Sequence, residues 1–211
     1  MVEKLFRKDP YLDSCKATIT FSKDGEITLD NTVFFAFAGG QQSDSGTIGG
    51  FKVLEARAQG PEIIYKLEDG ANLKEGDSVQ VQVDMEKRKK IMRLHSAAHL
   101  VYGVFSKQYE SKKLIGSNVT EDKSRIDFEH ETLLTELLPP IEEETNKLIE
   151  QNAEIKTYPD ENKPDRWWWE CIGFKYPCGG THVKSLGEIG KIKLKRKNIG
   201  AGKERIEITL A

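Results

Sequence analysis

The hydrophobic pattern of this chain changes its period at Asp84, and that change limits the folds available to it. Between residues 15 and 84 apolar and polar residues alternate, as they do at Val79, Val81 and Val83, which is the pattern of half-buried strands. Turn residues such as Lys23-Asp24-Gly25 separate these strands at regular intervals. We therefore expect a small closed β-barrel over residues 1–84.

Beyond Asp84 the apolar residues recur at helical spacing, as at Ile91, Leu94 and Ala98. This predicts a long amphipathic helix from about residue 85 to 108, with Asp84 bonding the free amides at its start. A strand at 126–128, a helix after Pro139-Pro140 and extended segments at 166–174, 190–197 and 205–210 follow. The predicted class is α+β, with a β-barrel domain over 1–84 and an α+β domain with a largely antiparallel sheet over 85–211.

The composition favours a globular protein. Of the 211 residues, 37% are hydrophobic and 31% are charged, and no apolar run approaches the roughly 20 residues that cross a bilayer. We expect no membrane partner, and a start without the apolar core of a signal peptide predicts a cytoplasmic protein. Three scattered cysteines predict reduced thiols.

The net charge is only -2, but the basic residues are concentrated near the end of the chain. Residues 191–205 contain seven basic residues against one acid, Glu204. Such a strip fits a phosphate backbone, with Lys193, Lys195 and Arg205 as candidate contacts. The same residues also fit an ordinary solvated strand face.

Two pairs of residues have the spacing of metal ligands. His95 and His99 lie four residues apart on the predicted helix, so both imidazoles leave the same face. Cys178 and His182 lie four apart across two glycines, which allows a loop to fold around an ion. Three imidazoles and one thiolate suit zinc. His130 is the remaining histidine. A metalloprotease would need a glutamate beside the first histidine as its general base, and position 96 is a serine, so we reject that function.

Two further segments have a structural and a functional interpretation. The glycines of the segment 39–46 indicate a tight loop, which is either a barrel turn or a place of close ligand approach. The run Trp167-Trp168-Trp169 suggests stacking on nucleic-acid bases. In a strand, however, Trp167 and Trp169 share one face and Trp168 lies on the other, so burial on both faces explains the three residues better. Cys171 is expected in the core.

Several motifs together resemble a known family. They are Arg93-Leu94-His95-Ser96-Ala97-Ala98-His99-Leu100, Cys178-Gly179-Gly180-Thr181-His182-Val183, Gly116-Ser117-Asn118-Val119 with Arg125-Ile126-Asp127-Phe128, and the Gly39-Gly40-Gln41 segment with Asp44 and Gly46. This set resembles the editing domain of alanyl-tRNA synthetase over nearly the whole chain. The chain has no room for an aminoacylation domain, so it is similar to the free-standing AlaX group in its medium-length form.

The resemblance implies a zinc enzyme that hydrolyses the ester between serine or glycine and the acceptor end of alanine transfer RNA. The expected zinc ligands are His95, His99, Cys178 and His182. Zinc can activate a water, polarise the ester carbonyl or position the substrate; the sequence does not choose among these roles, and we favour positioning. Thr181, Gln41 and Asp44 are expected to assist catalysis or shape the pocket. Leu114 and Gly116 are expected near the amino acid, and Leu114 replaces a side chain that is often polar in relatives.

Two other functions fit parts of the sequence. A non-catalytic RNA-binding module with a structural zinc would use the same basic strip and the same four ligands. An esterase for small acylated metabolites would act without RNA and show little salt dependence. No obligate protein partner is expected.

Overall fold

The computed structural model describes residues 1–109, 114–129, 134–163, 165–200 and 202–211. Contacts between Cα atoms divide the chain into two compact units, Met1–Lys89 and Lys90–Ala211. The predicted α+β class with mostly antiparallel sheets is confirmed. The predicted domain boundary after residue 84 stays a prediction.

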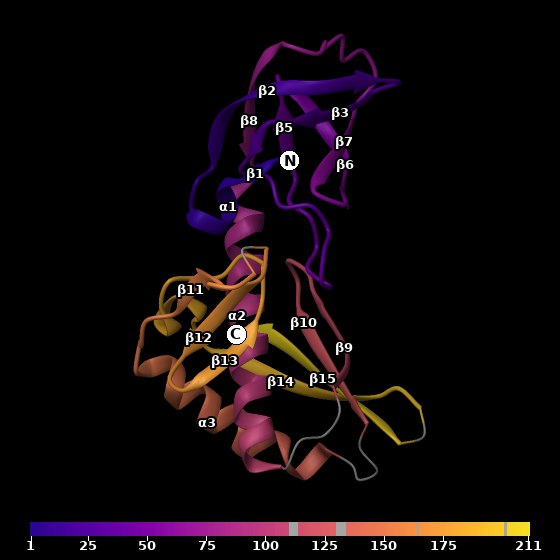
Figure 1. Cartoon of the computed structure of the whole chain (residues 1–211). Coiled ribbons are helices and arrows are strands. Elements are labelled where there is room, and N and C mark those ends of the chain that lie inside the picture. The colour runs from indigo at the N-terminus through magenta and orange to yellow at the C-terminus, as the bar shows by residue number, and fades with distance from the viewer. Residues whose placement is uncertain (110–113, 130–133, 164, 201) are drawn as a thin grey trace. The chain divides into compact units, whose positions relative to one another are not determined.

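The first unit is built mainly from strands (Figure 1). Six of them pair in the closed order β2-β3-β7-β6-β5-β8, and each neighbouring pair is antiparallel. A short helix and two short strands, which the sequence pattern did not predict, complete the unit. The elements are β1 (Glu3–Lys4), α1 (Leu5–Lys8), β2 (Ser14–Lys23), β3 (Glu26–Leu29), β4 (Asn31–Thr32), β5 (Gly46–Ile48), β6 (Phe51–Gln59), β7 (Glu62–Leu67) and β8 (Ser78–Val83).

One face of β7 and one face of β8 supply part of the core of this unit, as the alternating pattern predicts. On β8, Val79, Val81 and Val83 are buried and the residues between them are exposed. The core also contains Phe34 and Tyr65, whose rings meet edge to face with centroids 5.6 Å apart. The apolar residues before the glycine-rich segment are therefore part of the core.

A buried ion pair fixes the glycine-rich segment within the first unit. Arg88 and Asp44 have fully buried side chains, and the Arg88 Nε donates to Asp44 Oδ1 over 2.7 Å. Arg88 also donates to the carbonyl oxygens of Pro10 and Val33. Asp44 accepts a further bond from the amide of Phe35 over 2.6 Å. One arginine therefore connects three segments that are distant in sequence.

The long helix α2 spans Met85–Gln108, as the sequence predicts. The Asp84 side chain accepts bonds from the amides of Glu86 and Lys87, so it acts as the N-cap that satisfies free helical donors. Most of this helix belongs to the second unit.

The second unit contains two sheets (Figure 1). A four-stranded sheet has the order β14-β15-β10-β9, and a three-stranded sheet has the order β11-β12-β13. All the pairings in both are antiparallel. The elements after α2 are β9 (Leu114–Val119), β10 (Ser124–Glu129), a 3-10 turn (Leu134–Glu136), α3 (Leu138–Glu150), β11 (Lys156–Pro159), β12 (Trp167–Cys171), β13 (Phe174–Pro177), a 3-10 turn (Leu186–Ile189), β14 (Ile192–Asn198) and β15 (Lys203–Leu210).

Helix α2 packs against both sheets of this unit. Towards the four-stranded sheet, Phe105 meets Phe128 with ring centroids 4.4 Å apart. Towards the three-stranded sheet, Gly103 faces Phe174, and a Cβ at position 103 would come within 2.7 Å of that ring. Glycine is unfavourable inside a helix, so close approach of β13 explains its presence here.

The segment predicted as one strand over 166–174 is a hairpin. Ile172 and Gly173 both have positive φ, 42° and 85°, and they join β12 to β13. The prediction missed this turn because Ile is rare in the left-handed region and apolar residues continue through it. Trp169 and Cys171 are buried, as expected, whereas Trp167 and Trp168 are only half-buried.

The helices of the described residues contain no span long and apolar enough to cross a membrane.

Candidate metal centre

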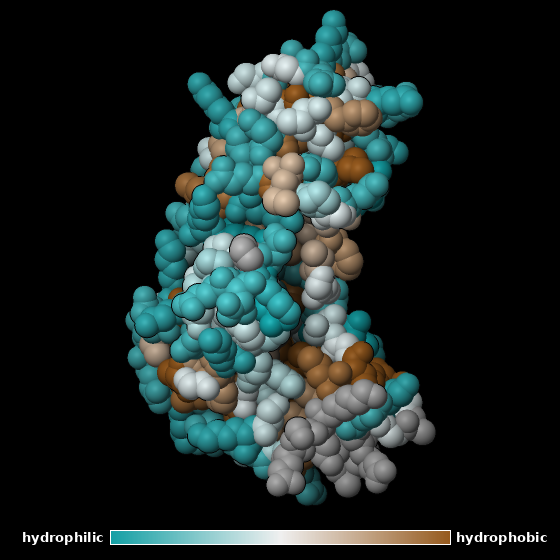
Figure 2. Space-filling view, in the orientation of Figure 1, coloured by the Kyte–Doolittle hydropathy of each residue, from teal (hydrophilic) through white to brown (hydrophobic). Residues whose placement is uncertain are grey.

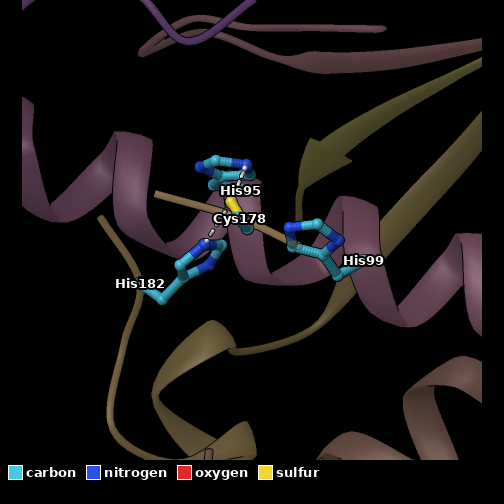
Figure 3. Close-up of side chains that lie close together, drawn as sticks. All are labelled: His95, His99, Cys178 and His182. Atoms are coloured by element: carbon cyan, nitrogen blue, oxygen red, sulfur yellow. Dashed lines mark hydrogen bonds between the residues drawn. The ribbon is translucent and has the colours of Figure 1, made fainter. Parts of the chain in front are cut away.

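Helix α2 supplies the first two donors of the candidate metal centre. His95 and His99 lie one turn apart on the helix, and their rings stack with centroids 5.1 Å apart. Figure 3 shows both imidazoles leaving the same side of α2. A rigid helix thus fixes their separation, as the four-residue spacing predicts.

The loop after β13 supplies the other two donors. The Cys178 amide donates to the Trp167 carbonyl over 2.8 Å, which attaches the start of this loop to β12. The Cys178 sulfur lies 3.5 Å from Nε2 of His95 and 3.1 Å from Nε2 of His182 (Figure 3). One ligand atom from each of His95, His99, Cys178 and His182 lies within 4.8 Å of the other three. The structure therefore brings the four predicted ligands together.

The three imidazoles are in the protonation state that a metal requires. Burial holds the pKa of His95 well below its ordinary value, and the neighbouring His99 lowers it further. Burial lowers the pKa of His99 to about 4. Burial, with His95 and His99, also holds the pKa of His182 well below its ordinary value. All three rings are neutral near pH 7 and keep a lone pair for a cation.

The hydrogen bonding of the cluster fits a metal ion. Nε2 of His99 is buried and has no hydrogen-bond partner among the described residues, although a buried polar atom is ordinarily paired. A cation shared with the other three donors would satisfy it. Three imidazoles and one sulfur form a donor set that zinc favours.

Aromatic side chains surround His99. Its ring stacks on Trp169, with centroids 5.0 Å apart, and on Tyr176, with centroids 5.5 Å apart. Trp169 is fully buried. Aromatic side chains of the three-stranded sheet therefore pack directly against the His99 ring.

Sequence reasoning did not assign Ser96 to the site. Its hydroxyl lies 3.2 Å from Nδ1 of His182 and accepts a bond from the Val183 amide. Ser96 directly follows His95, so helical spacing alone places it away from the ligand face. His130, the remaining histidine of the sequence, lies outside the described residues.

The predicted catalytic residues lie in both units. Thr181 is buried beside His182 in the second unit. Gln41 and Asp44 are buried in the first unit, and Asp44 is held by Arg88. Arg88 is flanked by lysines, so the sequence did not single it out. It lies three residues before Ile91, and that helical spacing places it on the apolar face of α2 and could have indicated its burial.

Leu114 and Gly116 are both on the edge strand β9. Leu114 is 40% exposed, and Figure 2 shows hydrophobic side chains gathered over this part of the sheet. Gly116 lies opposite Asp127 on β10, and a Cβ at position 116 would come within 3.3 Å of Asp127 Oδ2. The absence of a side chain at Gly116 therefore leaves room for the Asp127 carboxylate.

The basic residues of β14 and β15 differ in their partners. Lys193 pairs with Glu142 over 3.1 Å. Arg205 donates twice to Asp127, over 2.7 and 2.9 Å. For Lys195 no ion pair is found within the described part of the chain, and its register partner is Glu207. The strip is thus partly neutralised.

Comparison of the sequence with known families places the chain in the class of proteins that carry an aminoacyl-tRNA synthetase accessory domain. Residues 170–207 match the family described as the threonyl and alanyl tRNA synthetase second additional domain. The alanyl-tRNA editing protein AlaX-M of Pyrococcus horikoshii is 34% identical over 100% of this chain and 98% of its own length.

That similarity extends to a second editing protein and to a longer enzyme. AlaX-M of Methanosarcina barkeri is 31% identical over 100% of this chain and 99% of its own length. The alanine–tRNA ligase of Methanococcus maripaludis is 32% identical over 97% of this chain but only 25% of its own length. The chain belongs to the AlaX-M family of alanyl-tRNA editing proteins.

Proposed function

We propose that this protein is a zinc-dependent hydrolase that removes serine or glycine from mischarged alanine transfer RNA. Family membership and the four-donor cluster support this function. In the reaction water adds to the ester carbonyl, the acyl–oxygen bond breaks, and the amino acid leaves the ribose hydroxyl. A separate hydrolytic site is needed because a synthetase pocket that fits alanine cannot exclude the smaller glycine. The same pocket rejects serine by only about a hundredfold.

His95, His99, Cys178 and His182 would hold the zinc, which when bound supplies a Lewis acid that orients the substrate. Four protein donors fill a tetrahedral shell, as they do in structural zinc sites. Direct contact of zinc with either the substrate or a water therefore requires an expanded shell or a displaced ligand. Of these two roles we propose positioning of the substrate. The filled shell also keeps a second candidate open, which is an RNA-binding module with a purely structural zinc.

Residues next to the ligands are proposed to orient the ester. Thr181 precedes His182 and is buried, so its place is set by the same loop that carries Cys178. We assign Thr181 and the loop amides after Cys178 to the ester group. Gln41 and Asp44 are assigned to the shape of the glycine-rich segment, because Arg88 and the Phe35 amide already occupy the Asp44 carboxylate.

Strand β9 is proposed to contact the side chain of the amino acid that is attached to the transfer RNA. Leu114, at its start, offers a methyl-rich surface without a hydrogen-bonding group. A pocket of that kind discriminates by fit, typically by about 10- to 200-fold per methylene. We therefore propose that both serine-charged and glycine-charged transfer RNA are substrates and that serine is preferred over alanine only modestly.

The outer face of the four-stranded sheet is proposed to contact the transfer RNA backbone near the acceptor end. Register places Lys193, Lys195 and Arg205 on one face, because Lys195 pairs with Glu207 and Arg205 with Lys197. Arg196 faces the opposite side and pairs with the buried Glu204. Lys195 is the residue we expect to contribute most.

Turnover of charged transfer RNA decides between the two candidates. Purified protein is mixed with serine-, glycine- and alanine-charged alanine transfer RNA, and the surviving ester is counted with time. A hydrolase releases many equivalents of serine and glycine per protein, whereas a binding module protects at most one equivalent. Protection without release would overturn the proposed activity. Small acyl esters without RNA test the metabolite esterase in the same assay.

A further inference from the structure

We propose that Ser96 is a positioning residue of the metal centre, which orients His182 and attaches its loop to helix α2. The proposal rests on the metal site of the proposed function. It assigns a role to a serine that does not itself bind the ion, and it concerns the second layer of contacts around the four ligands.

The contacts of Ser96 join two distant parts of the chain. Its side chain is fully buried on α2. The hydroxyl oxygen lies 3.2 Å from Nδ1 of His182 and accepts the Val183 amide, also over 3.2 Å. A serine inside a helix ordinarily bonds a carbonyl of the preceding turn or points to solvent. Here one hydroxyl contacts two consecutive residues of the loop that carries Cys178.

The direction of these contacts matches what a ligand histidine requires. Nε2 of His182 faces the donor cluster, 3.1 Å from the Cys178 sulfur. A neutral imidazole that offers the lone pair of Nε2 carries its proton on Nδ1. Ser96 Oγ has two lone pairs and accepts both this proton and the Val183 amide. Outer acceptors of this kind fix the tautomer and orientation of ligand histidines.

Zinc affinity of matched variants tests the proposal. Ser96→Ala removes the acceptor and suits the helix, since alanine is its most favourable residue. Ser106→Ala is the control, because Ser106 is a half-buried serine on the same helix. Competition with a chromophoric chelator, without RNA, should show zinc affinity lowered about 10- to 100-fold in Ser96→Ala and unchanged in Ser106→Ala. Circular dichroism of the apo forms verifies folding.

Two further readouts separate positioning from packing. Ser96→Thr keeps the hydroxyl and should recover most of the zinc affinity. In the zinc-loaded wild type, ¹⁵N-histidine spectra should show a slowly exchanging proton on Nδ1 of His182, and in Ser96→Ala this proton should exchange faster. If Ser96→Thr does not fold, the exchange rates of the His182 Nδ1 proton in wild type and Ser96→Ala decide whether Ser96 positions this ring.

Three results would overturn the proposal: zinc affinity in Ser96→Ala equal to that of the control, a folded Ser96→Thr as weak as Ser96→Ala, or the His182 proton on Nε2 in the loaded protein. None of these measurements uses transfer RNA. A protein without deacylase activity could still pass them, and an active deacylase could fail them, so the two failures are distinguishable.

Discussion

At the scale of the residue, Cys178 is the ligand whose removal tests the metal centre most directly, because its sulfur contacts two of the histidines. Cys178→Ala should lower zinc affinity by more than roughly 100-fold, since even an outer partner is worth about 10- to 100-fold. Deacylation should be lost with the metal. Elemental analysis and single-turnover rates measure both.

A second cysteine provides the control for that experiment. Cys15 lies on β2 in the first unit, and Cys15→Ala should keep its full zinc content and activity. A full equivalent of zinc in Cys178→Ala would remove this sulfur from the ligand set.

Selectivity for the amino acid also belongs to the residue scale. Leu114→Thr adds a hydroxyl on β9, and a site that hydrogen-bonds the serine side chain rejects alanine more strongly than a site that only fits it. The ratio of serine to alanine deacylation should rise several-fold, roughly tenfold at most for one new hydrogen bond. Rates on both charged forms give the ratio.

The neighbouring residue is a matched control for position and exposure. Ile115→Thr makes a similar change one residue along the strand, at the register irregularity of β9, where the exposure is 37% against 40% for Leu114, and its ratio should stay at the wild-type value. A wild-type preference of several powers of ten, unchanged in Leu114→Thr, would show that another residue reads the hydroxyl.

At the scale of the element, strand β14 is expected to hold the RNA backbone. Lys195→Glu should weaken binding of alanine transfer RNA and reduce the slope of log affinity against log salt by about one, because one phosphate contact is lost. Lys193→Glu should have the smaller effect, since Lys193 already pairs with Glu142. Filter binding over a salt series measures the slopes.

A reversal of charge elsewhere controls for net charge. Lys156→Glu, on β11 of the other sheet, makes the same change in total charge at an exposed position. Equal slopes for Lys195→Glu, Lys156→Glu and wild type would exclude β14 from the interface.

The pairing of β10 with β15 should make stability depend on pH. Burial alone would raise the pKa of Asp127, but its bonds and ion pairs with Arg205 and Arg125 outweigh burial and leave the pKa below its ordinary value. The carboxylate therefore stabilises the fold at pH values above the unfolded pKa of about 4, and this stability is lost as the pH falls through the folded pKa.

The variant Asp127→Asn isolates this contribution. It should be on the order of 2 kcal/mol less stable than wild type at pH 7, and the difference should shrink below about pH 4. Urea unfolding at several pH values measures it. A difference that stays constant down to pH 3 would mean that the carboxylate charge is not what stabilises the pair.

Elements with strong periodicity were predictable from the sequence, and those set by tertiary contact were not. The bounds of α2 follow from the spacing of its apolar residues and the Asp84 cap. The turn at Ile172-Gly173 was missed because the apolar residues continue through it. The ligand pairs could be predicted separately from their spacing, but only the fold brings Cys178 to His95, 83 residues earlier in the chain.

At the scale of the whole molecule, the Arg88–Asp44 pair should dominate the stability of the first unit. Arg88→Met leaves a buried carboxylate without its partner, which typically costs about 3–5 kcal/mol. Asp44→Asn should also destabilise the unit. The double variant should be less destabilised than the sum of the two, because neither buried charge remains.

Urea unfolding of the four proteins completes this cycle. The exposed pair of Lys147 and Glu143 on α3 provides a comparison, and its removal should change stability by no more than about 0.5 kcal/mol. Additive losses for Arg88→Met and Asp44→Asn would mean that the two residues act independently.

The separation of the ligand pairs along the chain has a consequence for folding. An ion that joins His95 to Cys178 closes a loop of 83 residues, and closing a loop of that length costs about 4.5 kcal/mol of chain entropy. Most of the second unit lies inside this loop, so the four donors come together only when the chain between them folds. Zinc would then bind tightly only after the two sheets have met across α2, and its arrival would mark the completion of folding in this unit.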